Sequence, residues 1–142
     1  MNSEISKIEI LPEHNLLRRY VYPNPPKITL IKDDGTICST CFHLRPGEEG
    51  ISVDIEHLTT YEKAIVDTTK HRLLRLNAGD VQALDLTTEH DPIAIDTEQE
   101  PVNGSTHQLQ YDNYAHALIK GKIDKKIPKK LAALAIKINY PE

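Results

Sequence analysis

The sequence predicts an α+β domain in which helices pack on one mostly antiparallel or mixed sheet. Three observations predict it: short segments alternate apolar and polar residues, turn residues separate those segments, and the last segment repeats apolar residues at helical spacing. A chain of 142 residues has the size of one domain, residues 1–142, and can bury its own core. We therefore expect two layers, with a central helix and a C-terminal amphipathic helix.

Strand-like segments dominate the first third of the chain. LLRRYVY (16–22) favours a strand and stops at a proline-rich PNPP stretch. KITLI (27–31) and TICSTCF (36–42) flank an Asp-Gly pair, which indicates a hairpin. ISVDI (51–55) alternates at period two and is expected to be a strand.

The middle of the chain predicts a helix followed by further strands. Thr59 and Glu62 have capping-box spacing, so a helix of about three turns is expected to start there. The segments after it are assigned in order: 72–86 as two strands, with a helix as the alternative for its second half, 91–96 as a short strand, 97–108 as a loop, and 114–122 as a strand.

DKKIPKKLAALAIKI near the end has the clearest helical pattern. Asp124 can cap its first turn, and Pro128 fits within that turn because its missing N–H needs no partner there. Five apolar residues repeat on one predicted face: Ile127, Leu131, Leu134, Ala135 and Ile138.

Charge is unevenly distributed along a chain whose net charge is −4. Residues 118–137 contain seven lysines and one acid, so the lysines of the final helix either face water or form an interface. Because the whole chain is acidic and this segment lacks arginine, we do not expect nucleic-acid binding. No apolar run could span a bilayer and the N-terminus lacks a signal-peptide pattern, so we expect a cytoplasmic protein without membrane contact.

The two cysteines suit a reducing compartment and leave one metal hypothesis to weigh. Cys38 and Cys41 form a CxxC pair, and His43 follows, with His57 as a possible fourth zinc ligand. If residues 36–42 are a strand, the two thiols point to opposite faces and no metal site forms. We favour that interpretation and expect no metal.

Polar residues at strand positions give the strongest site candidates. Arg18 and Arg19 point to opposite faces of the first strand, so one of them faces the covered side and needs a carboxylate or phosphate partner. His116 lies in the last predicted strand and is either a functional residue or a buried histidine satisfied by a backbone carbonyl. Ser52 and Asp54 form a polar row with Glu56, which we interpret as an exposed strand face.

A second pattern resembles the Arg–Ser–Glu mono-ADP-ribosyltransferases. Arg19 lies on an early strand, Ser52 on a later strand, and Glu98-Gln99-Glu100 supplies an ExE motif, in the family's order. Residues 51–53 read Ile-Ser-Val where the family has Ser-Thr-Ser. The resemblance implies that Arg19 grips a dinucleotide, Ser52 lines its pocket and Glu100 stabilises an oxocarbenium-like transition state.

The chain also resembles a group of small prokaryotic proteins to which no function is attached. The matching stretches are Leu16-Leu17-Arg18-Arg19, Gly50-Ile51-Ser52-Val53-Asp54 and Asn113-Tyr114-Ala115-His116-Ala117. This resemblance implies a shared surface that contains Arg19, Ser52, Asp54 and His116.

These observations predict a small non-catalytic binding subunit that acts with a larger protein partner. The uneven charge would orient such a contact, and a homo-oligomer is also compatible with it. No nucleotide-loop or hydrolase motif is present, so no cofactor is expected. The alternative is an enzyme that handles NAD or a nucleotide with Arg19, Ser52 and Glu100, with His116 as acid–base group.

Overall fold

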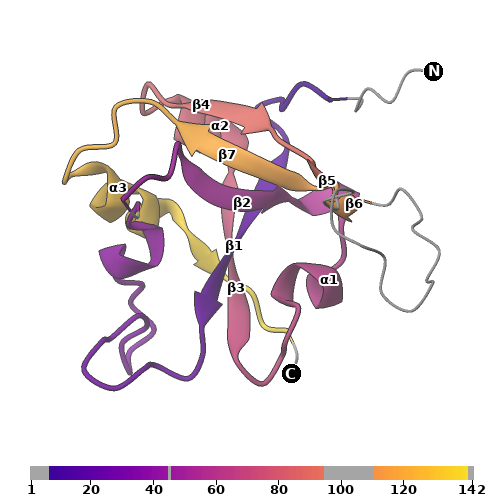
Figure 1. Cartoon of the computed structure of the whole chain (residues 1–142). Coiled ribbons are helices and arrows are strands. Elements are labelled where there is room, and N and C mark those ends of the chain that lie inside the picture. Colours follow the sequence, from indigo (N-terminus) through magenta and orange to yellow (C-terminus); the bar gives the residue numbers. More distant parts are fainter. Residues whose placement is uncertain (1–6, 45, 95–110, 141–142) are drawn as a thin grey trace, which may run out of the picture.

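The computed structural model describes residues 7–44, 46–94 and 111–140. Its main feature is a six-stranded antiparallel sheet against which short helices pack (Figure 1). Across the sheet the strands are β4 (Thr87–His90), β7 (His116–Lys120), β2 (Ile51–Ile55), β1 (Asn15–Val21), β3 (His71–Asn77) and β8 (Ile136–Lys137). The helices are α1 (Tyr61–Ile65), α2 (Ala78–Gln82) and α3 (Ile127–Leu134), with 3-10 helices η1 (Ser39–Phe42) and η2 (Glu56–Leu58). A two-stranded ribbon pairs β5 (Ile93–Ala94) with β6 (Tyr111–Asn113). The predicted α+β class is confirmed.

The two faces of the sheet differ in what covers them. Side chains alternate along each strand, so Leu16 of β1 and its partner Ile55 of β2 share what we call the core face. Residues from η1, α2 and α3 cover that face and complete the main core. Leu17 and its partner Asp54 share the other face, which we call the open face. There a smaller apolar cluster joins α1 to β1 and β3 and leaves the β2 and β7 side chains less covered.

Strand β1 separates from β2 while it stays paired with β3. All seven residues of β1 pair with β3, but only Leu16 and Leu17 pair with β2. In Figure 1, β2 runs across the direction of β1 beyond this point. The guanidinium of Arg18 bridges the separation, because its Nε donates to Cys41 O and its Nη1 to Ser52 O, both at 2.8 Å. The core face therefore contains an arginine whose charge is solvated by backbone carbonyls.

The predicted strand at residues 36–42 is wrong, although the turn before it is confirmed. Gly35 N donates to Lys32 O at 2.8 Å and Gly35 has a φ of +91°, which suits glycine. Only an isolated bridge, Ile31 to Ile37, closes the turn, so the predicted strand at residues 27–31 does not form either. The chain then coils into η1, which places Phe42 in the core with 0% exposure. Burial of this aromatic ring outweighs the β preference of the segment.

The predicted three-turn helix is much shorter in the structure. Thr60 rather than Thr59 caps α1, since its hydroxyl oxygen accepts from Lys63 N at 3.2 Å. The helix ends at Val66, whose φ of +70° and ψ of −58° form a three-residue turn closed by a bond from Asp67 N to Ile65 O. This turn redirects the chain into β3 after one buried helical turn.

Residues 72–86 follow the alternative that placed a helix in their second half. Strand β3 ends at Asn77, whose side chain accepts from Asp80 N at 3.0 Å and caps α2. Of the later segments, β7 lies within the predicted 114–122, and β5 is limited to Ile93–Ala94 among the described residues 91–94 of the predicted 91–96. Strand β4 was not predicted, and the predicted loop at 97–108 lies outside the described residues.

The C-terminal helix starts close to the predicted cap residue and ends early. Helix α3 begins at Ile127 with Lys126 at its N-cap position, and Asp124 Oδ1 accepts from Lys126 N at 2.9 Å and from Ile127 N at 3.2 Å in the turn that leads into the helix. After Leu134 the chain becomes extended and forms β8, which pairs with β3. Ile138 therefore packs with the open-face cluster, its N–H donating to Leu73 O, and is not on the helix face. Within the described ranges no helix has the length and apolarity to cross a bilayer.

Candidate functional site

Three of the four predicted site residues lie on the open face. On β1, Arg19 is two residues from Leu17 and therefore points to the same face. On β2, Ser52 is two residues from Asp54, and His116 of β7 is the cross-strand partner of Asp54, so both also lie on the open face. The fourth, Glu100, lies outside the described residues. Asp54 connects the group, because both Arg19 and His116 act electrostatically on its carboxyl group. The open face therefore holds two cationic or protonatable groups around one carboxyl group.

Asp54 is buried, which corrects the prediction that its polar row is an exposed strand face. Its side chain is 9% exposed, and Oδ1 accepts a bond of 2.7 Å from Asn113 Nδ2. Burial raises the pKa of this carboxyl group, while the bond from Asn113 and the charges of His116 and Arg19 oppose the rise. Glu56 leaves the row as well, because it lies in η2 and binds Arg75 through both carboxylate oxygens.

The amide of Asn113 is fixed in one orientation. Ala115 N donates to Asn113 Oδ1 at 3.1 Å, so the carbonyl end of the amide must face Ala115 and the NH₂ end must face Asp54. Ala115 O in turn accepts from Ile55 N at 2.8 Å, which ties the turn to β2. The carboxyl group of Asp54 is thus held by a donor that cannot rotate without losing a second hydrogen bond.

His116 is the direct partner of Asp54 across β2 and β7. Its Nδ1 lies 2.8 Å from the backbone oxygen of Asp91, which can only accept, so Nδ1 carries a proton. The Asp91 carboxylate is 3.4 Å from the same nitrogen. In the neutral imidazole Nε2 therefore carries the lone pair and can act as a base. The expected carbonyl contact of His116 is confirmed, and the side chain is 12% exposed.

His90 supports this arrangement from the core face. Its side chain is buried, and Ile8 N donates to its Nδ1 at 2.9 Å. Nε2 must then be the protonated nitrogen, and it donates to Tyr114 O at 2.7 Å. The two rings of His90 and Tyr114 also meet edge to face, with centroids 4.9 Å apart. His90 therefore fixes the turn that carries Asn113 and His116.

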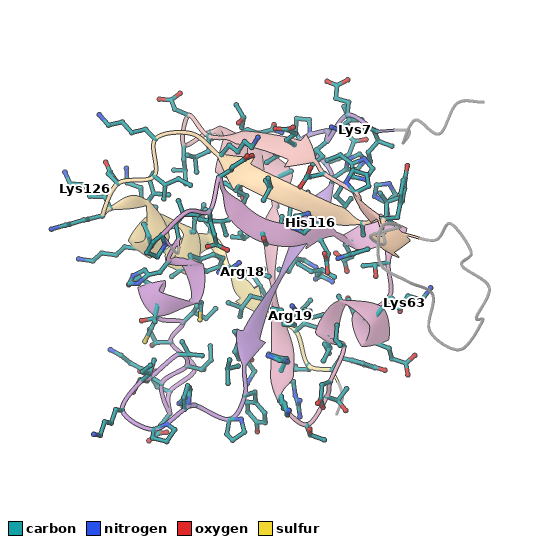
Figure 2. All side chains as sticks on the ribbon, viewed as in Figure 1. Lys7, Arg18, Arg19, Lys63, His116 and Lys126 are labelled. Carbon is teal, nitrogen blue, oxygen red and sulfur yellow. The ribbon has the colours of Figure 1, made fainter. Side chains whose placement is uncertain are left out.

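The consecutive arginines have different environments, as their opposite directions on β1 predicted. Figure 2 labels both on β1, with Arg18 toward η1 and Arg19 toward α1. Arg18 is half-buried and donates to the two backbone carbonyls described above. Arg19 is exposed and donates from Nη1 to Ala64 O at 3.2 Å. Arg19 is thus the one of the two that solvent or a ligand can reach.

The cysteine pair has no metal-site geometry. Cys38 precedes η1 and Cys41 lies within it, so the argument from opposite strand faces does not apply. Cys41 is buried, its Sγ lies 3.6 Å from Leu30 O, and burial raises the pKa of its thiol to about 11. Across residues 7–44, 46–94 and 111–140, no three His, Cys, Asp or Glu side chains gather closely enough to hold a metal ion.

Sequence reasoning missed His90 and Asp91 as site residues and gave Asn113 no role. The segment TTEH is polar on both faces of β4, so it lacks the alternation that identifies a half-buried strand. Asn113 appears in the quoted Asn-Tyr-Ala-His-Ala stretch, but its contact with Asp54 joins residues that are 59 positions apart. An asparagine directly before a two-residue turn into a strand was the available signal.

Comparison of the chain with protein-family models, with curated proteins and with solved structures finds no match. The candidate site is therefore defined by its geometry. It combines a buried carboxyl group of raised pKa, an imidazole with one nitrogen fixed as a donor, and an exposed guanidinium. Groups of these types can move a proton and hold an anion.

Proposed function

We propose that the chain is a small acid–base enzyme whose substrate carries an anionic group. One observation carries the proposal: His116, with its Nδ1 proton donated to Asp91 O, is the cross-strand partner of the buried carboxyl group of Asp54. His116 Nε2 takes a proton from the attacking water as the water oxygen bonds to the reacting carbon and the leaving group departs with the electrons of the bond that breaks. The imidazolium then releases this proton to solvent. Asp54 stabilises the imidazolium, and Arg19 binds the anion.

The substrate class we propose is NAD or a related nucleotide. Two facts support it: Arg19 and Ser52 lie on one face of the sheet, as the resemblance to Arg–Ser–Glu transferases requires, and a guanidinium is well suited to bind phosphate. Ser52 is half-buried beside Asp54 and would line the binding surface. The part of Glu100 in this proposal stays a prediction.

The test is to incubate the purified chain with NAD and to measure the released nicotinamide by chromatography. His116→Gln should lower turnover by roughly 100-fold or more, which is the usual contribution of a general acid–base group. Arg19→Gln should mainly raise KM. The matched controls are His43→Gln and Lys63→Gln, which remove an exposed imidazole and an exposed cation elsewhere. Turnover that His116→Gln leaves unchanged would exclude the acid–base role.

A binding subunit remains the second candidate, and the distribution of exposed apolar side chains favours it. Among the described residues, three of the six exposed large apolar side chains lie within residues 21–28, where the chain leaves β1: Val21, Tyr22 and Ile28. Apolar side chains gathered at one end of a molecule are typical of protein contacts. Charge asymmetry along the chain would orient such a contact.

Native mass spectrometry of the tagged chain isolated from its host tests this second candidate. A stoichiometric partner that is lost with Ile28→Ser but kept with Val66→Ser would support a contact at residues 21–28, because Val66 is equally a surface residue but lies after α1. A chain that is isolated alone, or a partner that both variants retain, would count against it.

A further inference from the structure

A cavity of about 550 Å³ lies where β1 ends, β3 begins and the chain continues beyond β8. Its lining includes Tyr20, Tyr22, Arg72, Lys137 and Tyr140. We propose that this cavity binds a mononucleotide, with the base against the tyrosine rings and the phosphate between the two cations. Its volume is within the range of small-molecule sites, which is roughly 300–1,000 Å³.

The aromatic part of the cavity provides stacking surfaces for a planar base. Three of the six tyrosines of the chain line it, and Tyr22 and Tyr140 supply the accessible rings, because Tyr20 is only 5% exposed. Tyr22 is 45% exposed, so one side of its ring is open to a ligand while the guanidinium of Arg72 lies 4.4 Å from its centroid. Tyr140 contacts the ring of Tyr61, with centroids 5.5 Å apart, which holds it in place. Base–aromatic stacking of this kind tolerates any base.

The charged part of the cavity selects an anion. Arg72 and Lys137 are the charged residues among the described residues that line it, so the lining is cationic although the whole chain carries a net charge of −4. The guanidinium of Arg72 is held before any ligand arrives, because its Nη1 donates to Thr68 O and to His71 O. A fixed guanidinium and an exposed ammonium group in one cavity suit a phosphate.

This cavity is separate from the site around Asp54 and His116. Tyr20 and Arg72 are cross-strand partners of β1 and β3 and share the core-face parity, whereas Arg19 has the open-face parity. Lys137 pairs with Leu74 and so shares the face of Arg72. Ile138 and Tyr140, which also line the cavity, pack with the open-face cluster, but none of Arg19, Ser52, Asp54 and His116 is among the lining residues. The inference therefore stands or fails independently of the proposed acid–base enzyme.

The experiment is a titration of the full chain with adenosine monophosphate, observed through ring-labelled tyrosine resonances in NMR spectra. The chain has no tryptophan and six tyrosines, so the ring signals can be assigned one by one. We expect saturable shifts for Tyr20, Tyr22 and Tyr140 and none for Tyr114. Adenosine and inorganic phosphate, titrated separately, should each bind at least roughly 10-fold more weakly, because each makes only half of the contacts.

Variants locate the two halves of the site. Arg72→Gln and Tyr22→Leu should each weaken the binding of adenosine monophosphate at least roughly 10-fold. The charge-matched control Lys63→Gln should bind it as tightly as the unmodified chain does. If Arg72→Gln does not fold, Lys137→Gln replaces it, since Lys137 is exposed on β8. The proposal is overturned if adenosine monophosphate gives no saturable shift, if phosphate alone binds equally well, or if the folded variants bind unchanged.

Discussion

Asp54 and His116 face each other across the β2–β7 ladder, and the turn between β6 and β7 supplies a third residue, Asn113, that donates to the carboxyl group. The two side chains thus lie on neighbouring strands of the sheet. His116 is held by the backbone oxygen of Asp91, and Asp54 is held by the Asn113 amide, which the backbone N–H of Ala115 fixes in turn. Groups held in this way keep their geometry without a ligand, which is the condition for efficient proton transfer.

Asp54→Asn should raise stability and abolish activity. Burial raises the pKa of Asp54 above its ordinary 3.8, so the ionised carboxylate costs the folded protein free energy at neutral pH. The neutral amide still accepts from Asn113 and removes that cost, with an expected gain of roughly 0.5–2 kcal/mol in the free energy of unfolding. Urea unfolding at pH 7 measures the gain, which should disappear well below pH 3.8, where both side chains are neutral. A loss of stability at pH 7 would contradict the burial cost.

Replacing the consecutive arginines should have opposite consequences. Arg18→Gln leaves the carbonyls of Cys41 and Ser52 without their charged donor, so we expect a loss of roughly 2 kcal/mol of stability. Arg19→Gln removes an exposed guanidinium and should change the free energy of unfolding by less than roughly 0.5 kcal/mol. Thermal unfolding of the two variants, each with the same change of charge, checks the difference. Equal destabilisation would mean that Arg19 is structural.

Acid should weaken the link between η2, α1 and β3. Arg75 donates to both carboxylate oxygens of Glu56, at 2.9 and 2.7 Å, and Tyr61 donates its hydroxyl to the same carboxylate at 2.8 Å. The bond from Arg75 lowers the pKa of Glu56 below its ordinary 4.5, so the stabilisation is complete above that pH and is lost as the pH falls through the lower folded value.

Glu56→Gln should therefore cost roughly 1–2 kcal/mol at neutral pH and flatten the fall in stability below pH 4.5. Unfolding curves over a pH series measure both effects. Lys70→Gln is the control, because Lys70 and Asp67 form an exposed pair at 4.0 Å that should contribute little. If Lys70→Gln flattened the acid limb as much as Glu56→Gln does, the assignment to Glu56 would be wrong.

The two thiols should differ sharply in reactivity. Cys38 is partly exposed, whereas Cys41 is buried and burial raises its pKa to about 11. Since the thiolate is the reactive form, a disulfide reagent at pH 8 should label Cys38 in the folded protein and label Cys41 only after unfolding. Mass spectrometry of the labelled chain counts the modified sites, with Cys38→Ser as the matched variant. Rapid labelling of Cys41 in that variant would show that η1 opens readily.

Alternation along strands allowed a large part of the candidate site to be predicted. The period of two placed Arg18 and Arg19 on opposite faces, and the same pattern defined β2, which extends over the predicted residues 51–55. The pattern near the C-terminus likewise predicted the start of α3, because Asp124 and Pro128 act through local backbone groups. Features that depend on neighbouring residues in the chain were thus readable from the sequence.

Features that depend on distant pairing were not. The burial of Asp54 requires Asn113, and the tautomer of His90 requires Ile8, which is 82 positions away. The early end of α1 is a related case. Ala64 and Ile65 pack against Leu17 of β1 and Leu73 of β3, and the chain turns directly afterwards at Val66. Val66 has a positive φ, which a β-branched residue rarely adopts. No local preference of residues 59–71 indicates that turn.

The order of strands across the sheet has a consequence for synthesis of the chain. Strand β2, near the centre of the sheet, pairs on one side with β7, and β3 pairs on one side with β8. Neither pairing can form until the ribosome has synthesised β7 and β8, which come much later in the chain. During translation β2 and β3 are therefore synthesised before the strands that pair with their edges. Long-range pairing of this kind slows folding and exposes unpaired strand edges. We expect the nascent chain to depend on chaperones until residues 116–137 have left the ribosome.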